Sequence, residues 1–246
     1  MSATCPPRSA AFFDLDRTVL ATVSTLAFRR TLSQAGLLSA ATVARAAYAQ
    51  TAMQLFGASA RQIERSRAAL LRVTEGWDAQ RVRDLVNGAL EEVITPRIYP
   101  EAVALLAQHR RAGRRLYLVS TSGVEVVEPI AAALGVPHVI ATRTAIDAHG
   151  RYAGALDFFA YGPAKAAAMR AEAAAHGLEL AESYAYSDSV TDLPMLESVG
   201  TPVAVNPDRR LRAVAAARGW QIRDFARPRR HTRTRRRPIL HEGCNP

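Results

Sequence analysis

The chain has 246 residues, 49% of them hydrophobic, which is enough to bury a core and excludes a disordered protein. Only 7% of the residues are aromatic while alanine recurs in long runs, so the composition favours a helix-rich α/β fold over an all-β one. The net charge of +10 is uneven, because residues 227–246 hold seven arginines and one acid, which leaves +4 for residues 1–226. The body of the chain is therefore not strongly basic.

The two cysteines, Cys5 and Cys244, lie near opposite ends of the chain and have no metal-ligand spacing. They predict no disulfide framework, which is typical of a reducing compartment. Residues 1–10 lack the apolar stretch of a signal peptide, and no segment reaches the ~18 uninterrupted apolar residues of a membrane span. We therefore expect a cytoplasmic protein without a transmembrane segment; the sequence makes no prediction of oligomeric state.

Residues 10–14 form the first apolar segment, which ends abruptly in the carboxylate of Asp14. This pattern is typical of a buried parallel strand that delivers a polar group to its C-terminal edge, where functional groups of open α/β sheets collect. Three later strands with polar ends are expected at residues 115–120, 183–187 and 202–205. With the helices predicted from residue 100 and from residue 208, they predict a doubly wound, Rossmann-like core with a parallel sheet flanked by helices.

The residues between the first two strands carry no strand signal and predict a separate all-helical module, a cap folded over the strand edge. Its helices are expected at residues 24–35, 39–56, 59–75 and 78–94. A hairpin with a turn at residues 147–150 is expected over residues 140–157, late in the core. The predicted units are an N-terminal tail at 1–9, the core at 10–22 and 95–226, the cap at 23–94, and a basic, disordered tail at 227–246.

The pair Asp14 and Asp16 at the end of the first strand is the strongest local signal of chemistry. One carboxylate can attack phosphorus while the other carries protons to the leaving group and from water. The pair alone also fits a calcium loop or a solvated turn. An EF-hand is disfavoured, because its loop needs glycine and glutamate where Val19 and Thr25 stand.

Three further elements fit a phosphoryl group. Ser120 and Thr121 precede a helix, whose N-terminal amides stabilise an anion, and Lys165 at the head of an alanine-rich helix supplies positive charge. Asp188 and Asp192 lie four residues apart at a strand-to-helix turn, an arrangement that suits one direct magnesium ligand and one residue that positions it. Each element alone has an ordinary interpretation, as an N-cap, a solvated lysine or a helix cap.

The order of these elements resembles the haloacid dehalogenase superfamily, and more specifically subfamily IB, which includes the phosphoserine phosphatases. The resemblance covers approximately residues 10–225. It rests on the large helical insertion, which implies a C1-type cap, and on residues 119–123, 162–165, 184–196 and 203–207.

The resemblance implies covalent catalysis in two steps. Asp14 attacks the phosphoryl group, while Asp16 protonates the leaving oxygen and then activates water against the aspartyl-phosphate. Family dehalogenases lack the second aspartate and the transport ATPases carry threonine there, so Asp16 favours a phosphatase or a phosphomutase. A mutase usually has another cap arrangement, so hydrolysis is the leading interpretation. The implied enzyme is a phosphoric monoester hydrolase with a cap that opens and closes, because water has to be excluded and then admitted.

The resemblance also implies the ligands of the site. The Mg²⁺ site would comprise four aspartates: Asp14, Asp16 through its backbone carbonyl, Asp188, and Asp192, which positions the site or a bound water. The phosphoryl oxygens would be held by Ser120, Thr121 and Lys165. The metal and the lysine offset the repulsion between a phosphate dianion and a carboxylate nucleophile.

The substrate stays open at this stage. A small phosphomonoester is expected, with phosphoserine as one candidate, although residues 19–30 lack the glutamate that binds the serine ammonium in phosphoserine phosphatases. Two alternatives remain: a lysophospholipid-type phosphate hydrolase at the membrane surface, and a non-catalytic binding protein that acts through its arginine-rich tail. That tail, residues 227–246, could contact anionic lipid or nucleic acid weakly, and the simplest interpretation is a solubilising end.

Overall fold

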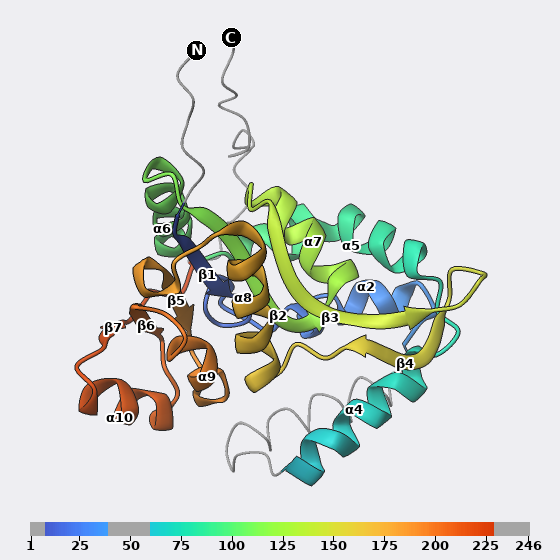
Figure 1. Cartoon of the computed structure of the whole chain (residues 1–246). Helices are drawn as coiled ribbons and strands as arrows, with labels where there is room; N and C mark the ends of the chain where they lie inside the picture. Colours follow the sequence, from blue (N-terminus) through green and yellow to red (C-terminus); the bar gives the residue numbers. More distant parts are fainter. Residues whose placement is uncertain (1–7, 39–59, 229–246) are drawn as a thin grey trace, which may run out of the picture.

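The computed structural model of the protein describes residues 8–38 and 60–228. Its core is a seven-stranded sheet in the order β4-β3-β2-β1-β5-β6-β7 (Figure 1). The strands are β1 (Ala10–Asp14), β2 (Arg115–Gly123), β3 (His138–Ile146), β4 (Tyr152–Phe158), β5 (Tyr184–Ser187), β6 (Thr201–Val205) and β7 (Gln221–Arg223). All pairs are parallel except β3 with β4, so the predicted α/β fold with a largely parallel sheet is confirmed.

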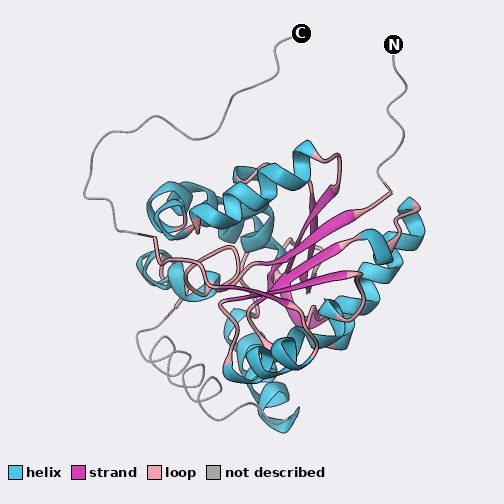
Figure 2. Ribbon diagram, turned by 90° about the vertical axis from the view of Figure 1, so that its left-hand side faces the viewer, coloured by secondary structure: helices cyan, strands magenta, loops and turns pink. Residues whose placement is uncertain are grey.

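Strand β1 lies at the centre of the sheet, and its five residues are all buried. Its side chains alternate between two hydrophobic clusters: Ala11 and Phe13 belong to one, Ala10 and Phe12 to the other. Figure 2 shows the sheet between two layers of helices. One layer contains α5 (Ala79–Val93), α6 (Pro100–Arg111) and α7 (Val124–Ala133). The other contains α8 (Pro163–His176), α9 (Leu193–Leu196) and α10 (Arg209–Ala217).

The predicted hairpin at residues 140–157 corresponds to β3 and β4, but its first strand, β3, also pairs with β2 in the core of the sheet. The N-terminal half of β3 pairs in parallel with β2, from His138 opposite Tyr117 onward, and only its C-terminal half pairs with β4. The strand is long enough to serve both pairings, so it is a core strand that the sequence pattern did not separate from the hairpin. The three-residue edge strand β7 was also not predicted.

The helical insertion begins with two short helices, α1 (Ser24–Ala27) and α2 (Arg29–Gln34), in place of the single helix expected at 24–35. The break falls at Phe28, whose side chain is fully buried in the core. Helices α4 (Ala60–Thr74) and α5 match the predictions at 59–75 and 78–94 to within one residue. The helix expected at 39–56 and most of the basic tail lie outside the described residues.

The tip of the β3–β4 hairpin is hydrogen-bonded to the connection between α4 and α5. The amide of Gly76 donates to the carbonyl of Tyr152 (2.8 Å), and the amide of Tyr152 donates back to the carbonyl of Trp77 (2.9 Å). The amide of Ala79 donates to the carbonyl of Gly150 (3.0 Å). The buried side chain of Tyr152 packs against Ala79. These hydrogen bonds therefore attach the insertion to the hairpin, in addition to its two chain connections and the packing of α5 against the core.

In residues 8–38 and 60–228, no helix combines the length and the hydropathy that crossing a membrane requires.

A buried histidine on α6 predicts a loss of stability in acid. His109 Nε2 lies 2.7 Å from the hydroxyl of Tyr186, and burial, with help from Arg114 and Arg223, lowers its pKa from 6.5 to about 4. A group with a lowered folded pKa stabilises the protein above its unfolded pKa, so this contribution is lost as the pH falls from 6.5 through 4. The maximum effect is on the order of 3 kcal/mol. Urea unfolding at pH 7 and at pH 4.5 measures it.

The matched variant is His109→Gln, whose amide can still pair with the Tyr186 hydroxyl but does not titrate. Because other groups also titrate in this range, the difference between the two pH slopes isolates the histidine. We expect the wild type to lose more unfolding free energy than the variant between pH 7 and pH 4.5. Equal slopes would contradict the role of His109.

Candidate active site

The C-terminal ends of the central strands bring the predicted site residues to one edge of the sheet. Asp14 ends β1 opposite Val119, so it lies beside Ser120 of β2, and Asp188 directly follows β5 on the other side of β1. Because β1, β2 and β5 are parallel, these ends coincide. The side chains of Asp14, Ser120 and Asp188 are all buried.

Lys165 connects two of the aspartates. It lies in the first turn of α8, and its Nζ atom is 2.8 Å from Asp14 Oδ1 and 2.9 Å from the carboxylate of Asp192. Its side chain is only 3% exposed. Burial lowers the pKa of Lys165, but the two carboxylates outweigh that effect and hold the pKa above its ordinary value. A permanent positive charge is thus fixed beside the predicted nucleophile.

The site contains more carboxylates than cations. Burial raises the pKa of Asp14 well above its ordinary value; Lys165 opposes this, while Asp192 and Asp188 add to it. Burial also raises the pKa of Asp188 to about 7, against the opposing charge of Arg17, whose Nε atom is 3.3 Å from Asp188 Oδ2. Such a surplus of buried negative charge is typical of a place where a bound cation contributes to the folded state.

Asp16 is held by two serines from different parts of the fold. Its Oδ1 accepts the amide of Ser24 at 2.8 Å, and its Oδ2 accepts the hydroxyl of Ser122 at 3.3 Å. The two serine hydroxyls lie 2.9 Å apart. Burial raises the pKa of Asp16, while the hydrogen bonds from Ser24 and Ser122 lower it. A carboxyl group with a raised pKa is suited to donating and accepting protons near neutral pH.

Arg17 occupies a strained backbone conformation directly after Asp16. Its φ angle of 66° lies in the left-handed region, which residues with a Cβ rarely adopt. The turn that follows is closed by hydrogen bonds from Arg17 N to Thr22 O (3.2 Å) and from Val19 N to Leu15 O (3.0 Å). Strain of this kind persists only where the surrounding structure imposes it, and here it places the Arg17 side chain against Asp188.

The loop that carries Asp188 and Asp192 is fixed from two sides. The hydroxyl of Ser187 donates to Asp192 Oδ2 at 2.8 Å. Asp208 accepts the amide of Val190 at 2.9 Å, and the amide of Asp208 donates to the carbonyl of Asp188 at 2.7 Å. Asp192 makes no side-chain capping bond to α9, so its carboxylate faces Lys165 and is not a helix cap.

The two predicted phosphate-binding hydroxyls differ in their surroundings. Ser120 Oγ is buried and accepts the amide of Ser122 at 3.1 Å, which leaves its own proton for another acceptor. The hydroxyl of Thr121 donates to the carbonyl of Ala160 at 2.9 Å, in the segment before α8. Ser120 therefore belongs to the edge with Asp14, while the Thr121 side chain is turned toward the neighbouring loop.

The donor set suits a hard cation, although no three His, Cys, Asp or Glu side chains within the described ranges converge as a complete metal site. The side chain of Lys165 lies between Asp14 and Asp192, and that of Arg17 lies beside Asp188. The ligand set implied by the resemblance contains only two carboxylates that bind the metal directly, those of Asp14 and Asp188, together with the backbone carbonyl of Asp16. Oxygen donors of this kind fit magnesium, which keeps several waters in protein sites.

Comparison with known proteins identifies the family. The family model of the haloacid dehalogenase-like hydrolases matches residues 11–197, about three quarters of the chain. The chain belongs to the haloacid dehalogenase-like hydrolase family. All the predicted site residues lie within the matched range, so the family assignment covers the whole site.

Several curated members of the family are similar over most of their length. The chain is 52% identical over 222 residues to the inhibition of morphological differentiation protein of Streptomyces azureus; the aligned region covers 90% of this chain and 80% of that protein. It is 48% identical over 221 residues to a probable phosphatase of Mycobacterium tuberculosis (90% and 77% covered). It is 35% identical over 227 residues to a phosphoserine phosphatase of the same organism (92% and 73% covered).

Solved structures share the fold of this chain. A Bordetella pertussis protein of unknown function superimposes with a TM-score of 0.77 at 32% identity, covering 89% of this chain and 99% of that one. A phosphoserine phosphatase with an analogue of its phospho-aspartyl intermediate gives a TM-score of 0.64 at 15% identity (90% and 95% covered), which shows a shared fold. The predicted resemblance and the predicted enzyme class, a phosphoric monoester hydrolase, are confirmed.

Proposed function

We propose that the protein is a Mg²⁺-dependent phosphatase that hydrolyses a small phosphomonoester through a phospho-aspartate on Asp14. The observation that carries the proposal is the buried ion pair of Lys165 with Asp14 and Asp192, at the strand edge that also holds Ser120 and Asp188. A lysine charge fixed within 2.8 Å of a carboxylate offsets the repulsion that a phosphate dianion meets there.

In the first step a carboxylate oxygen of Asp14 bonds to phosphorus and the bond from phosphorus to the leaving oxygen breaks. Asp16, held by Ser24 and Ser122, gives its proton to that oxygen. In the second step water attacks the phosphorus of the aspartyl-phosphate, Asp16 takes the water proton, and Asp14 is released. Ser120 and Lys165 hold the phosphoryl oxygens through both steps.

The metal would be held by the carboxylates of Asp14 and Asp188 and by the backbone carbonyl of Asp16. Asp192 would position the site. A bound Mg²⁺ supplies positive charge that lets an anionic phosphoryl group approach a carboxylate. The raised pKa values of Asp14 and Asp188 support this assignment: burial is the main cause of both and neighbouring carboxylates add to it, and a bound cation would offset both effects.

The names of two relatives support a substrate class. One is named a phosphoserine phosphatase and another, from Neisseria meningitidis, a histidinol-phosphatase, 28% identical over 222 residues. Phosphoserine and histidinol phosphate are both phosphate esters of small primary alcohols that carry an amino group. We therefore propose an ester of this kind, with phosphoserine as one candidate; its ammonium group would have to be bound outside residues 19–30, which contain no acid.

Metal dependence is the first test. With p-nitrophenyl phosphate, we expect phosphate release in the presence of Mg²⁺, loss of turnover after treatment with EDTA, and recovery when Mg²⁺ is restored. Circular dichroism of the chelated protein verifies that it stays folded. Undiminished turnover after exhaustive chelation would overturn the proposed metal dependence.

The role of Asp16 predicts a loss that depends on the leaving group. Asp16→Asn is expected to lower turnover of an alkyl phosphate about 10²–10⁴-fold. The first step with p-nitrophenyl phosphate suffers less, because p-nitrophenolate leaves without a proton. Phosphoenzyme should therefore accumulate, visible as a rapid burst of p-nitrophenol in stopped-flow measurements.

The matched control is Asp84→Asn, which removes an exposed carboxylate on α5. It should turn over both substrates at the wild-type rate. An equal loss with both leaving groups and no burst in Asp16→Asn would refute the assignment of Asp16 as the proton carrier.

A further inference from the structure

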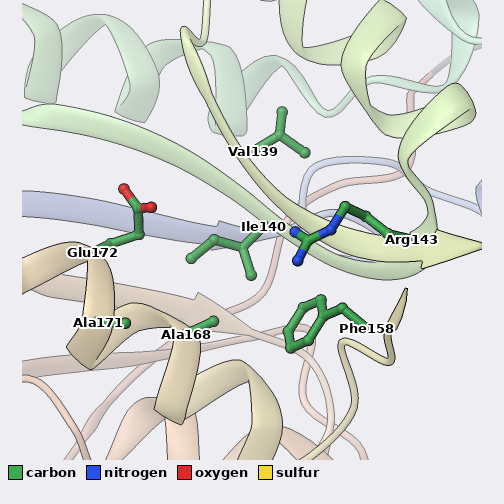
Figure 3. A pocket seen from close by; sticks show the side chains of 7 residues that line it. All are labelled: Val139, Ile140, Arg143, Phe158, Ala168, Ala171 and Glu172. Atoms are coloured by element: carbon green, nitrogen blue, oxygen red, sulfur yellow. The ribbon is translucent and has the colours of Figure 1, made fainter. Parts of the chain in front are cut away.

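A cavity of about 190 Å³ lies between β3, the end of β4 and α8. Figure 3 shows it from close by, with side chains from all three elements around it. None of the seven residues that line it belongs to the site around Asp14. The cavity is therefore a separate feature, which the proposed reaction does not use.

The two ends of the cavity carry opposite charges. Arg143 of β3 and Glu172 of α8 lie on opposite sides, with Ile140 and Ala168 between them and Phe158 beside Arg143 (Figure 3). Arg143 has no carboxylate within ion-pair distance in the described part of the chain. Its guanidinium group lies over the Phe158 ring, 5.1 Å from the ring centroid. This stacking holds the guanidinium at the cavity while leaving its N–H groups for an external acceptor.

Glu172 is also held in place. Its Oε2 accepts the hydroxyl of Tyr117 at 3.1 Å and lies 3.4 Å from Nδ1 of His176. Neither Lys nor Arg forms a salt bridge with it among residues 8–38 and 60–228. The carboxylate therefore keeps a negative charge and an oxygen, Oε1, for an external donor.

These features together select the chemistry of a ligand. The lining offers one cation, one anion and an apolar floor, so it matches a molecule with a carboxylate, an ammonium group and a small aliphatic part. The carboxylate of Glu172 would repel the dianion of a phosphate ester, so a phosphorylated ligand is disfavoured. The volume corresponds to that of roughly six waters and is below the ~300 Å³ of sites for drug-sized ligands. We infer that this cavity is a second, non-catalytic binding site for a small zwitterion, an α-amino acid with an aliphatic side chain.

The test is an NMR titration of the ¹⁵N-labelled full chain with L-valine. Valine has no hydroxyl group, so it does not imitate the alcohol product of a phosphatase. We expect saturable shifts of amides in β3 and α8. Isobutyrate, which lacks the ammonium group, and isobutylamine, which lacks the carboxylate, should bind at least about tenfold more weakly.

Two variants and one control locate the site. Arg143→Met keeps an aliphatic stem on Phe158 but removes the charge, and Glu172→Gln keeps an acceptor for Tyr117. Each should weaken valine binding at least about tenfold and leave turnover of p-nitrophenyl phosphate unchanged. Arg170→Met is the control, because Arg170 is on the same helix but contacts Ser198; it should bind valine like the wild type.

Three results would each overturn the inference. The first is the absence of saturation at valine concentrations well above about 1 mM. The second is a set of shifts confined to residues around Asp14. The third is unchanged affinity in both Arg143→Met and Glu172→Gln.

Discussion

Asp14→Asn is expected to lower phosphatase turnover at least about 10³-fold while leaving the protein as stable as the wild type. An amide cannot form the aspartyl-phosphate. Burial raises the pKa of Asp14 well above its ordinary value, so the folded state disfavours its charge, and a neutral isostere at this position removes that cost. Lys165 keeps Asp192 as an ion-pair partner. Steady-state kinetics with thermal unfolding of the same samples measure both effects.

Trapping of the intermediate sharpens this prediction. Rapid quenching in acid during turnover should leave a phosphoryl group on a peptide that contains Asp14 in the wild type, and none in Asp14→Asn. Asp84→Asn is again the matched control and should be labelled like the wild type. Turnover of Asp14→Asn within tenfold of the wild type, in a sample shown by mass spectrometry to be free of deamidation, would exclude Asp14 as the nucleophile.

Lys165→Met should lower kcat/KM roughly 10²–10³-fold, the loss typical of a charge removed from a developing anion. It should also destabilise the protein, because Asp14 and Asp192 are left buried without their common partner. Removing one side of a buried ion pair costs roughly 3–5 kcal/mol, less what the carboxyl groups recover by taking up protons.

The pH dependence of that loss has a definite sign. Without the lysine the pKa of Asp14, already raised by burial, rises further. A carboxyl group with a raised folded pKa contributes stability that is complete below its unfolded pKa, near 3.9, and is lost as the pH rises through the folded pKa. The stability deficit of Lys165→Met should therefore be larger at pH 8 than at pH 5.5. Urea unfolding at the two pH values measures it, and a deficit that is equal or reversed would contradict the ion pair.

The sequence was sufficient to predict that the candidate site residues lie near one another, because parallel strands bring their C-terminal ends to one edge of the sheet. Asp14, Ser120 and Asp188 each end or follow a strand, and the structure places those strands side by side. Lys165 reaches the same edge from the first turn of α8. Such positions are encoded locally, in a short apolar run and the residue that terminates it.

The supporting contacts could not be predicted in this way. Ser24 and Ser122 meet at Asp16 although 98 residues separate them in the chain. Asp208 holds the loop of Asp188 from the start of α10. No local pattern indicates such contacts, because they depend on how the start of the insertion and the start of α10 pack against the edge of the sheet. The left-handed backbone of Arg17 is equally hidden, since arginine has no preference for that conformation.

The hydrogen bonds between the hairpin tip and residues 76–79 limit how the helical insertion can move. A module that is joined to the core by two chain connections alone can rotate about them as a rigid body. This insertion is also held by the packing of α5 against the core and by three backbone hydrogen bonds to the hairpin. Breaking the three hydrogen bonds alone costs about 3 kcal/mol, so fewer than roughly one molecule in a hundred has them broken at equilibrium. We therefore expect most movements of the insertion to be smaller than a rotation of the whole module, with the three hydrogen bonds to the hairpin kept.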